Sequence, residues 1–265
     1  MKKVLTIAGS DCSGGAGIQA DLKTFAAHGV YGMSVIVSVV AENTCRVIDT
    51  QDITPDMIKK QIDAVFEDIE PDAVKIGMLS GRESMEAVAE KLEQYRPVNV
   101  VIDPVMLAKG GHALMKENAL EVFISRMIPL AGMLTPNIPE AESITGLQIT
   151  SSEHMKKAAQ MIYKMGAASV LVKGGHLEGD AEDILFDGKE FYTYSTKRIR
   201  TKNTHGTGCT FSSAIASNLA LGMSHSMAVE KAKTYVTGAI ENSLEIGRGH
   251  GPLHHFSSVY RNGLL

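Results

Sequence analysis

Short apolar, β-branched runs alternate with longer amphipathic stretches along the chain, and this alternation most constrains the fold. Runs such as 4–9, 34–42 and 99–106 suit strands buried on both faces. Stretches such as 18–29, 54–69 and 83–95 carry the period of helices. The pattern predicts an α/β fold with a mostly parallel sheet covered by helices on both faces. Only Asp187-Gly188, between two strand-like runs, indicates a hairpin.

The chain carries no linker, low-complexity tract or repeat, so one domain over residues 1–265 is expected. Its formal net charge is −4, it has no Trp, and aromatic residues make up only 5%. A nucleic-acid partner is therefore not expected, because both the charge and the stacking side chains are missing. No apolar stretch approaches the roughly 18 residues of a membrane span. The three cysteines lack the spacing of a zinc site, and we expect a reducing cytoplasm.

Glycines and polar residues gather where the expected strands end. In an open parallel sheet, ligands bind beyond the carboxyl ends of the strands. We therefore expect one ligand cleft at this edge. The expected strands end at Gly9, Glu42, Gly77, Asp103 and Lys173.

Gly206, Thr207, Gly208 and Cys209 come directly before an apolar helical stretch. Glycines let main-chain N–H groups turn inward, and the start of a helix adds a positive dipole potential. The segment is a candidate hole for an anion such as a phosphoryl group in transfer. It is not a Walker A loop, because the lysine of that motif is missing. A glycine-rich turn that merely caps a structural helix is the alternative.

Cys209 falls in the first turn of that helix, where a thiol pKa is expected to be lowered. A thiolate there is a candidate general base for a substrate hydroxyl. The alternative, a small buried apolar residue, is the expectation for Cys12 and Cys45.

Candidates for binding a metal and a nucleotide lie on neighbouring strand ends. Asp103, Asn137 and Glu140 would suit a hydrated Mg²⁺, which takes few direct protein ligands alongside nucleotide phosphates. An Asn cap and a solvated Glu are the alternative. Lys173 is placed to meet an ATP phosphate, although a solvent-facing lysine is equally compatible. Weaker candidates are Lys109 for phosphate, Gly110-Gly111 and Gly14 to Gly17 as hinges, and His205 and His250 as residues that only shape loops.

Eight segments in one order resemble the hydroxymethylpyrimidine/phosphomethylpyrimidine kinases of the ribokinase-like superfamily. The likeness covers nearly the whole chain and implies a three-layer α/β/α domain, often a homodimer. It also implies two successive Mg²⁺- and ATP-dependent phosphorylations, from 4-amino-5-hydroxymethyl-2-methylpyrimidine to the diphosphate used for thiamine. The segments are AGSDCSGGAGIQADLKTF, VVAENT, KIGML, IDPVMLAKGG, LTPNIPEAE, VLVKGGH, HGTGCTFSSAIA and GHGPLHH.

The resemblance also implies residue roles. Cys209 stands where the wider superfamily usually carries a catalytic Asp, and Glu42 stands where many relatives carry Gln. The pyrimidine pocket matches Gly9, Asp21, Glu42, Met78 and Val105; the anion hole matches Gly206 to Cys209; the metal region matches Asp103 and Glu140; the ATP side matches Lys173, with Asn137 beside it.

Three other functions compete with this expectation. A pyridoxal kinase is the nearest, but pyridoxal has no exocyclic amine to donate to Glu42. A sugar kinase of the same superfamily is disfavoured by Cys209. A non-catalytic pyrimidine sensor would be expected to lose at least one of Asp103, Glu140, Lys173 and Cys209, and the chain retains all four.

Overall fold

The computed structural model describes residues 1–106, 114–116, 119–175 and 179–261. These residues form one nine-stranded sheet in the order β3-β2-β1-β4-β5-β6-β7-β8-β9. The pairs from β2 to β7 are parallel, and β2–β3, β7–β8 and β8–β9 are antiparallel. The strands are β1 (Lys3–Asp11), β2 (Tyr31–Glu42), β3 (Val47–Asp52), β4 (Ala73–Ile76), β5 (Val100–Ile102), β6 (Met133–Leu134), β7 (Val170–Lys173), β8 (Ala181–Phe186) and β9 (Phe191–Thr196).

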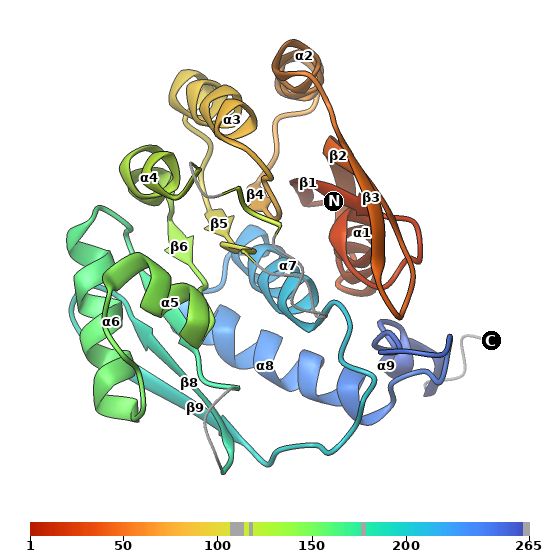
Figure 1. The fold of residues 1–265 in the computed structure, drawn as a ribbon, viewed down its shortest axis with the longest axis vertical. Helices are drawn as coiled ribbons and strands as arrows, with labels where there is room; N and C mark the ends of the chain where they lie inside the picture. Colours follow the sequence, from red (N-terminus) through yellow and green to blue (C-terminus); the bar gives the residue numbers. More distant parts are fainter. Residues whose placement is uncertain (107–113, 117–118, 176–178, 262–265) are drawn as a thin grey trace.

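Helices cover both faces of this sheet, which confirms the three-layer α/β/α expectation (Figure 1). One layer contains α1 (Gly17–Ala27), α7 (Thr207–Ala220) and α8 (His225–Glu241). The other contains α2 (Pro55–Phe66), α3 (Arg82–Tyr95), α4 (Leu120–Val122), α5 (Ile138–Thr145) and α6 (Ser152–Lys164). A last helix, α9 (Ser257–Arg261), lies near the end of α8.

Two apolar layers hold the sheet between the helices. Alternate residues of one strand point to opposite faces, so Leu5 and Ile7 of β1 join the layer under α2 to α6, whereas Val4 joins the layer under α7 and α8. The central strands are fully buried, as their nearly continuous apolar runs predicted. Among the described residues, no helix is long and apolar enough to cross a membrane.

The structure confirms the expected hairpin and the three long helices named above. The Asp187-Gly188 turn joins β8 to β9, and Gly188 has a φ of +91°. One strand was missed. β3 is polar and mostly exposed, with the sequence VIDTQD, so it lacks the apolar pattern that identified the others. It pairs only with β2, as an edge strand.

Candidate active site

The parallel strands bring their carboxyl ends to one edge of the sheet, and the start of α7 lies against this edge. An alanine Cβ at Gly208 would lie 3.2 Å from Asp103 Oδ2 and 3.6 Å from Lys173 Nζ. Asp103 follows β5, and Lys173 ends β7. The fold therefore joins the predicted anion hole to the predicted metal and nucleotide residues. Figure 1 shows α7 running from this edge across the sheet.

Gly206 lets the turn before α7 pack against the loop that follows β1. Its φ is +79°, and an alanine Cβ there would lie 1.8 Å from the Gly15 carbonyl oxygen. The N–H groups of the first helical turn have no acceptor within the helix. Thr207 N–H donates to Thr204 O at 3.3 Å, and Gly208 and Cys209 follow in the same turn. The N–H group of Thr207 is thus already paired, and those of Gly208 and Cys209 are the candidates for the predicted anion hole.

A Gly206→Ala variant is expected to lose at least about 3 kcal/mol of unfolding free energy, because the positive φ and the backbone clash both oppose a Cβ. Gly222, just beyond the other end of α7, is a matched control. Its φ is +90°, but no atom would lie within 4 Å of an added Cβ. Gly222→Ala should lose only about 1 kcal/mol. Urea unfolding of both variants checks this, and equal losses would contradict the clash.

Asp103 and Lys173 form a nearly buried ion pair at the centre of this edge. Lys173 Nζ donates to Asp103 Oδ1 at 2.6 Å, and the exposed fractions of the two side chains are 14% and 2%. Thr135 Oγ1 also donates to Oδ1, at 3.1 Å. Burial opposes the charge on Lys173, but the carboxylates of Asp103 and Glu140 outweigh it and raise the pKa of Lys173. Lys173 is thus a fixed cation beside the anion hole, not a solvent-facing lysine.

Asn137 and Glu140 form the capping box that starts α5. Glu140 N–H donates to Asn137 Oδ1 at 2.9 Å, and Asn137 N–H donates to Glu140 Oε2 at 2.7 Å. Asn137 is therefore the N-cap of α5, which was the alternative to a metal ligand. Only its amide Nδ2 group is left for a ligand. The alternative of a solvated Glu is not realised, because Glu140 is buried. Main-chain pairing of Asn137 with Lys173 places these two predicted ATP-binding residues side by side.

The carboxyl groups of Asp103 and Glu140 fit a divalent cation. Burial first, and repulsion from Asp103, raise the pKa of Glu140 to about 7, although Lys173 partly opposes this. Among the described residues, Oδ2 of Asp103 accepts a hydrogen bond only from Ser212 Oγ, at 3.4 Å. A cation would relieve the repulsion and use the weakly engaged oxygen. Oxygen donors of this kind are the ligands that Mg²⁺ prefers.

Cys209 lies in the first turn of α7 as predicted, but the expectation of a lowered pKa was wrong. Burial raises the pKa of its thiol to about 11, and the charges of Asp21 and Asp103 act in the same direction. The nearby Lys75 ammonium and the Gly17 N–H oppose this without cancelling it. The helix start is a local effect, whereas desolvation depends on everything packed around the sulfur.

Asp21 lies beneath the pocket rather than in its wall. It is fully buried, and its oxygens accept from Lys75 Nζ at 2.8 and 2.9 Å, from Thr6 Oγ1 at 2.6 Å and from Ser213 Oγ at 2.7 Å. A ligand would have to displace one of these donors to reach it. We therefore assign Asp21 to the support of the site, where it joins α1 to β1, β4 and α7.

A Lys75→Met variant is expected to lower the unfolding free energy by about 3–5 kcal/mol, because it leaves the Asp21 charge buried without its partner. Lys60→Met is the control. Lys60 pairs with Asp56, but their side chains are 66% and 75% exposed, so the loss should stay below about 1 kcal/mol. Chemical denaturation of both variants provides the measurement. Equal stability of the two variants would contradict this prediction.

Two residues of the predicted pyrimidine pocket, Gly9 and Met78, lie against each other. An alanine Cβ at Gly9 would lie 2.8 Å from Met78 Cε and 2.7 Å from Ser38 Oγ, so only glycine allows this close approach. Ser38 was not predicted, and its buried hydroxyl is the one buried side-chain polar atom without a partner among the described residues. Val105 is half-buried two residues beyond Asp103, to whose carbonyl its N–H donates.

Asp11 and His205 hold the two loops of the site together, and sequence reasoning missed Asp11. His205 Nε2 lies 2.8 Å from Asp11 Oδ2, across 194 residues of chain. His205 thus does shape the loops, as predicted. The position of Asp11 could have identified it, because an aspartate between a strand and a glycine-rich loop can accept hydrogen bonds from the main-chain N–H groups of that loop. His250, the other loop histidine, donates its N–H to Thr44 O.

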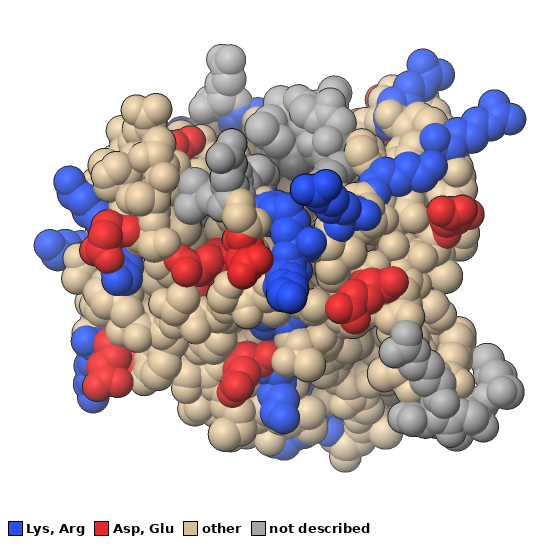
Figure 2. Space-filling view, turned by 90° about the horizontal axis from the view of Figure 1, so that it is seen from below, with Lys and Arg blue, Asp and Glu red and all other residues tan. Residues whose placement is uncertain are grey.

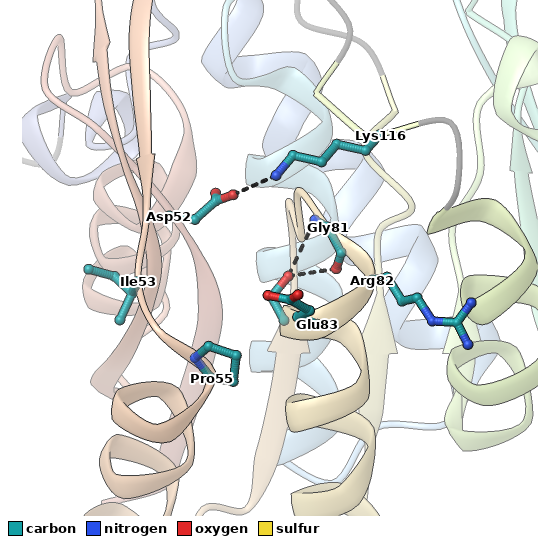
Figure 3. Close-up of a pocket in the computed structure, with 8 residues that line it drawn as sticks. Asp52, Ile53, Pro55, Gly81, Arg82, Glu83 and Lys116 are labelled. Atoms are coloured by element: carbon teal, nitrogen blue, oxygen red, sulfur yellow. Dashed lines mark hydrogen bonds and ion pairs between the residues drawn. The ribbon is translucent and has the colours of Figure 1, made fainter.

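A separate cavity of about 210 Å³ lies between the end of β3 and the start of α3 (Figure 3). Lys116 Nζ donates to Asp52 Oδ2 at 3.0 Å, and Ser84 caps Gly81. Two of its charged residues, Asp52 and Lys116, thus pair across it, and we assign it no function. Lys109, Gly110 and Gly111 lie outside the described residues. Figure 2 shows a band of Lys and Arg side chains from the centre of the displayed face to its upper right, with acidic side chains beside it.

Comparison with known proteins agrees with this geometry. Residues 11–254 match the family model described as phosphomethylpyrimidine kinase. The chain is 48% identical, over 99% of its length and 97% of the relative's, to the hydroxymethylpyrimidine/phosphomethylpyrimidine kinase of Bacillus subtilis. It is 52% identical to the thiamine biosynthesis bifunctional protein ThiED of Geobacter sulfurreducens, with 95% of the chain aligned, but spans only 52% of that protein.

Two solved structures extend the likeness to three dimensions. The phosphomethylpyrimidine kinase of Clostridium difficile superposes with a TM-score of 0.82 at 51% identity, over 91% of this chain and 100% of that one. The pyridoxal kinase of Bacillus subtilis, solved as an ADP complex, superposes with a TM-score of 0.91 at 37% identity, over 98% of this chain and 99% of that one. The fold alone therefore does not separate the two activities, although identity is higher to the pyrimidine kinases.

Proposed function

Because this chain belongs to the phosphomethylpyrimidine kinase family, we propose that it phosphorylates 4-amino-5-hydroxymethyl-2-methylpyrimidine twice, with Mg·ATP as donor. The first transfer gives the monophosphate and the second the diphosphate for thiamine. The observation that carries the proposal is the meeting of Gly208, Asp103 and Lys173 within a few ångströms at the start of α7. Phosphoryl transfer depends mainly on positioning and on charge stabilisation, and these groups supply both.

Each group has a distinct role in this proposal. Main-chain N–H groups at the start of α7, those of Gly208 and Cys209 among them, donate to the phosphoryl oxygens as charge builds up on them. Lys173 neutralises a nucleotide phosphate, with the Nδ2 group of Asn137 beside it. Asp103 and Glu140 would hold Mg²⁺, which would supply positive charge to the nucleotide phosphates. The Cys209 thiol faces the acceptor hydroxyl.

Glu42, Gly9, Met78 and Val105 select the acceptor. Met78 and Val105 supply apolar contacts, and Gly9 lets Met78 approach the main chain closely. Glu42 accepts from the exocyclic amine of an aminopyrimidine, a donor that pyridoxal lacks. Pyridoxal kinase activity is the second candidate, since a pyridoxal kinase superposes with a TM-score of 0.91.

The deciding experiment measures ADP release with Mg·ATP and three acceptors: hydroxymethylpyrimidine, its monophosphate and pyridoxal. Turnover of both pyrimidines with poor turnover of pyridoxal is expected. ³¹P NMR of the products separates the monophosphate from the diphosphate. A preference for pyridoxal would retain the phosphoryl-transfer site but overturn the substrate assignment.

The proposal includes one catalytic domain over residues 1–265, acting in the cytoplasm as a homodimer. The retained thiols Cys12 and Cys45 are exposed and unpaired, which suits a reducing compartment. Sedimentation of the purified chain tests the assembly. A single species at the 28.4 kDa of one chain would reject the dimer.

A further inference from the structure

Three side chains from distant parts of the chain meet at the pyrimidine end of the site. Asp11 ends β1, Glu42 ends β2 and His205 precedes α7, and one potential ligand atom of each lies within 4.8 Å of the other two. Phosphoryl transfer as proposed above uses neither Asp11 nor His205. Their position beside the residue that selects the acceptor points to a role in recognition.

Hydrogen bonds fix Asp11 as an anion. Its oxygens accept from Ser13 N at 2.7 Å, Gly15 N at 3.0 Å, Ala16 N at 2.8 Å and His205 Nε2 at 2.8 Å. Burial opposes the charge, but these bonds, with His205 and Ser13 foremost, hold the pKa of Asp11 far below its usual range. A carboxylate offers about four acceptor sites, so these four donors nearly fill it. A metal ion would have to displace them, which argues against a metal site here.

The fixed charge of Asp11 acts on Glu42. Glu42 is half-buried, and burial first, then the Asp11 charge and a side-chain hydrogen bond to Asp11, raise its pKa to about 7, while His205 partly opposes them. The Cys12 thiol lies 3.1 Å from the carbonyl oxygen of Glu42 and thus bonds its main chain. Two carboxyl groups this close do not both ionise readily.

Resting on the proposed function, we propose that Asp11 and His205 are positioning residues with different roles: Asp11 keeps Glu42 as a neutral carboxylic acid in the pocket, and His205 occupies Asp11 so that the Glu42 proton is available to the ligand. Such an acid offers one C=O to the exocyclic amine and one O–H to the adjacent ring nitrogen. An ionised Glu42 would still accept from the amine but would place a second acceptor against the nitrogen lone pair. The protonated Glu42 also hydrogen-bonds Asp11, but three main-chain N–H groups and His205 compete with it for the Asp11 oxygens, so the ring nitrogen of the ligand can take over the Glu42 O–H. A glutamine side chain presents the same acceptor and donor.

The first test is the KM for hydroxymethylpyrimidine between pH 6 and 9 at saturating Mg·ATP, in the natural chain and in Glu42→Gln. Dividing the KM of the natural chain by the KM of Glu42→Gln cancels the titration of the substrate and of groups that both proteins share. We expect this ratio to be flat below pH 7 and to rise by up to about tenfold per pH unit above it, as Glu42 loses its proton. In Asp11→Asn the rise should begin at lower pH. A constant ratio, or an unmoved break in Asp11→Asn, would overturn the proposal.

His205 has its own pair of variants. His205→Leu vacates an acceptor site on Asp11 that can then take the Glu42 proton, so KM at pH 6 should rise by about tenfold, the worth of one hydrogen bond. His205→Gln retains an N–H donor and should restore most of the affinity. Equal KM values in the two variants would reject the positioning role of His205.

If a variant fails to fold, a measurement on the natural chain that needs no turnover still tests the proposal. ¹³C NMR of glutamate-labelled protein follows the Glu42 carboxyl, identified as the signal missing in Glu42→Gln. A midpoint near pH 7 is expected, and one near the ordinary 4.5 would overturn the neutral acid. If the natural chain phosphorylated no pyrimidine, the proposed function would fail, whereas this titration would still decide the state of Glu42.

Discussion

Replacing Lys173 with methionine is expected to lower kcat for both phosphorylations by about 10²–10³-fold, the usual effect of removing one preorganised charge from a transition state. Each step transfers the γ-phosphoryl group of an ATP, so kcat of both steps should fall by a similar factor. Lys173 also neutralises Asp103, and its loss leaves that carboxylate buried without its cation. Single-turnover rates with each acceptor give the effect on chemistry, and thermal unfolding gives the effect on stability.

Lys91→Met separates catalysis from stability. Lys91 also pairs with an aspartate, Asp63, at 2.7 Å with 11% of its side chain exposed, but it lies on α3, away from the start of α7. This control should unfold more easily and retain its kcat. If Lys91→Met lost as much kcat as Lys173→Met, the effect would be one of folding rather than of phosphate binding.

Replacing Cys209 with alanine is expected to slow the first phosphorylation by about 10²–10³-fold and the second by less than about tenfold. The first acceptor is an alcohol that must lose a proton, whereas the second is a phosphate monoester that is already anionic near neutral pH. Cys12→Ala and Cys45→Ala are the controls, because both of these cysteines are exposed. Equal loss in the two steps would leave Cys209 as part of the anion hole only.

The pH dependence provides a second test of Cys209. Because burial raises the pKa of its thiol to about 11, only a small fraction is thiolate at neutral pH. If the thiolate is the base, kcat of the first phosphorylation should rise by about tenfold per unit from pH 7 to 9, following that fraction. The second phosphorylation should lack this rise. A flat profile for the first step would exclude the thiolate as its base.

Hydrophobic patterning along the chain predicts the layers of the fold and the edge of the sheet that carries the candidate site. Buried parallel strands require apolar side chains on both faces, so β1, β2, β4 and β5 stand out as apolar runs. Their carboxyl ends must meet at one edge, which places Asp103 and Lys173 together before any coordinates are known. β3 escaped because an exposed edge strand needs no apolar face.

Only the tertiary structure decided the states of the charged and titratable groups. The pKa of Cys209 follows from burial by residues distant in sequence, which outweighs the local effect of the helix start. Asp21 was expected in the pocket but pairs with Lys75, 54 residues away, and Asp11 meets His205 across 194 residues. Local patterns fix secondary structure because its hydrogen bonds are local or regular. Desolvation and ion pairing depend instead on which distant side chains the fold brings into contact.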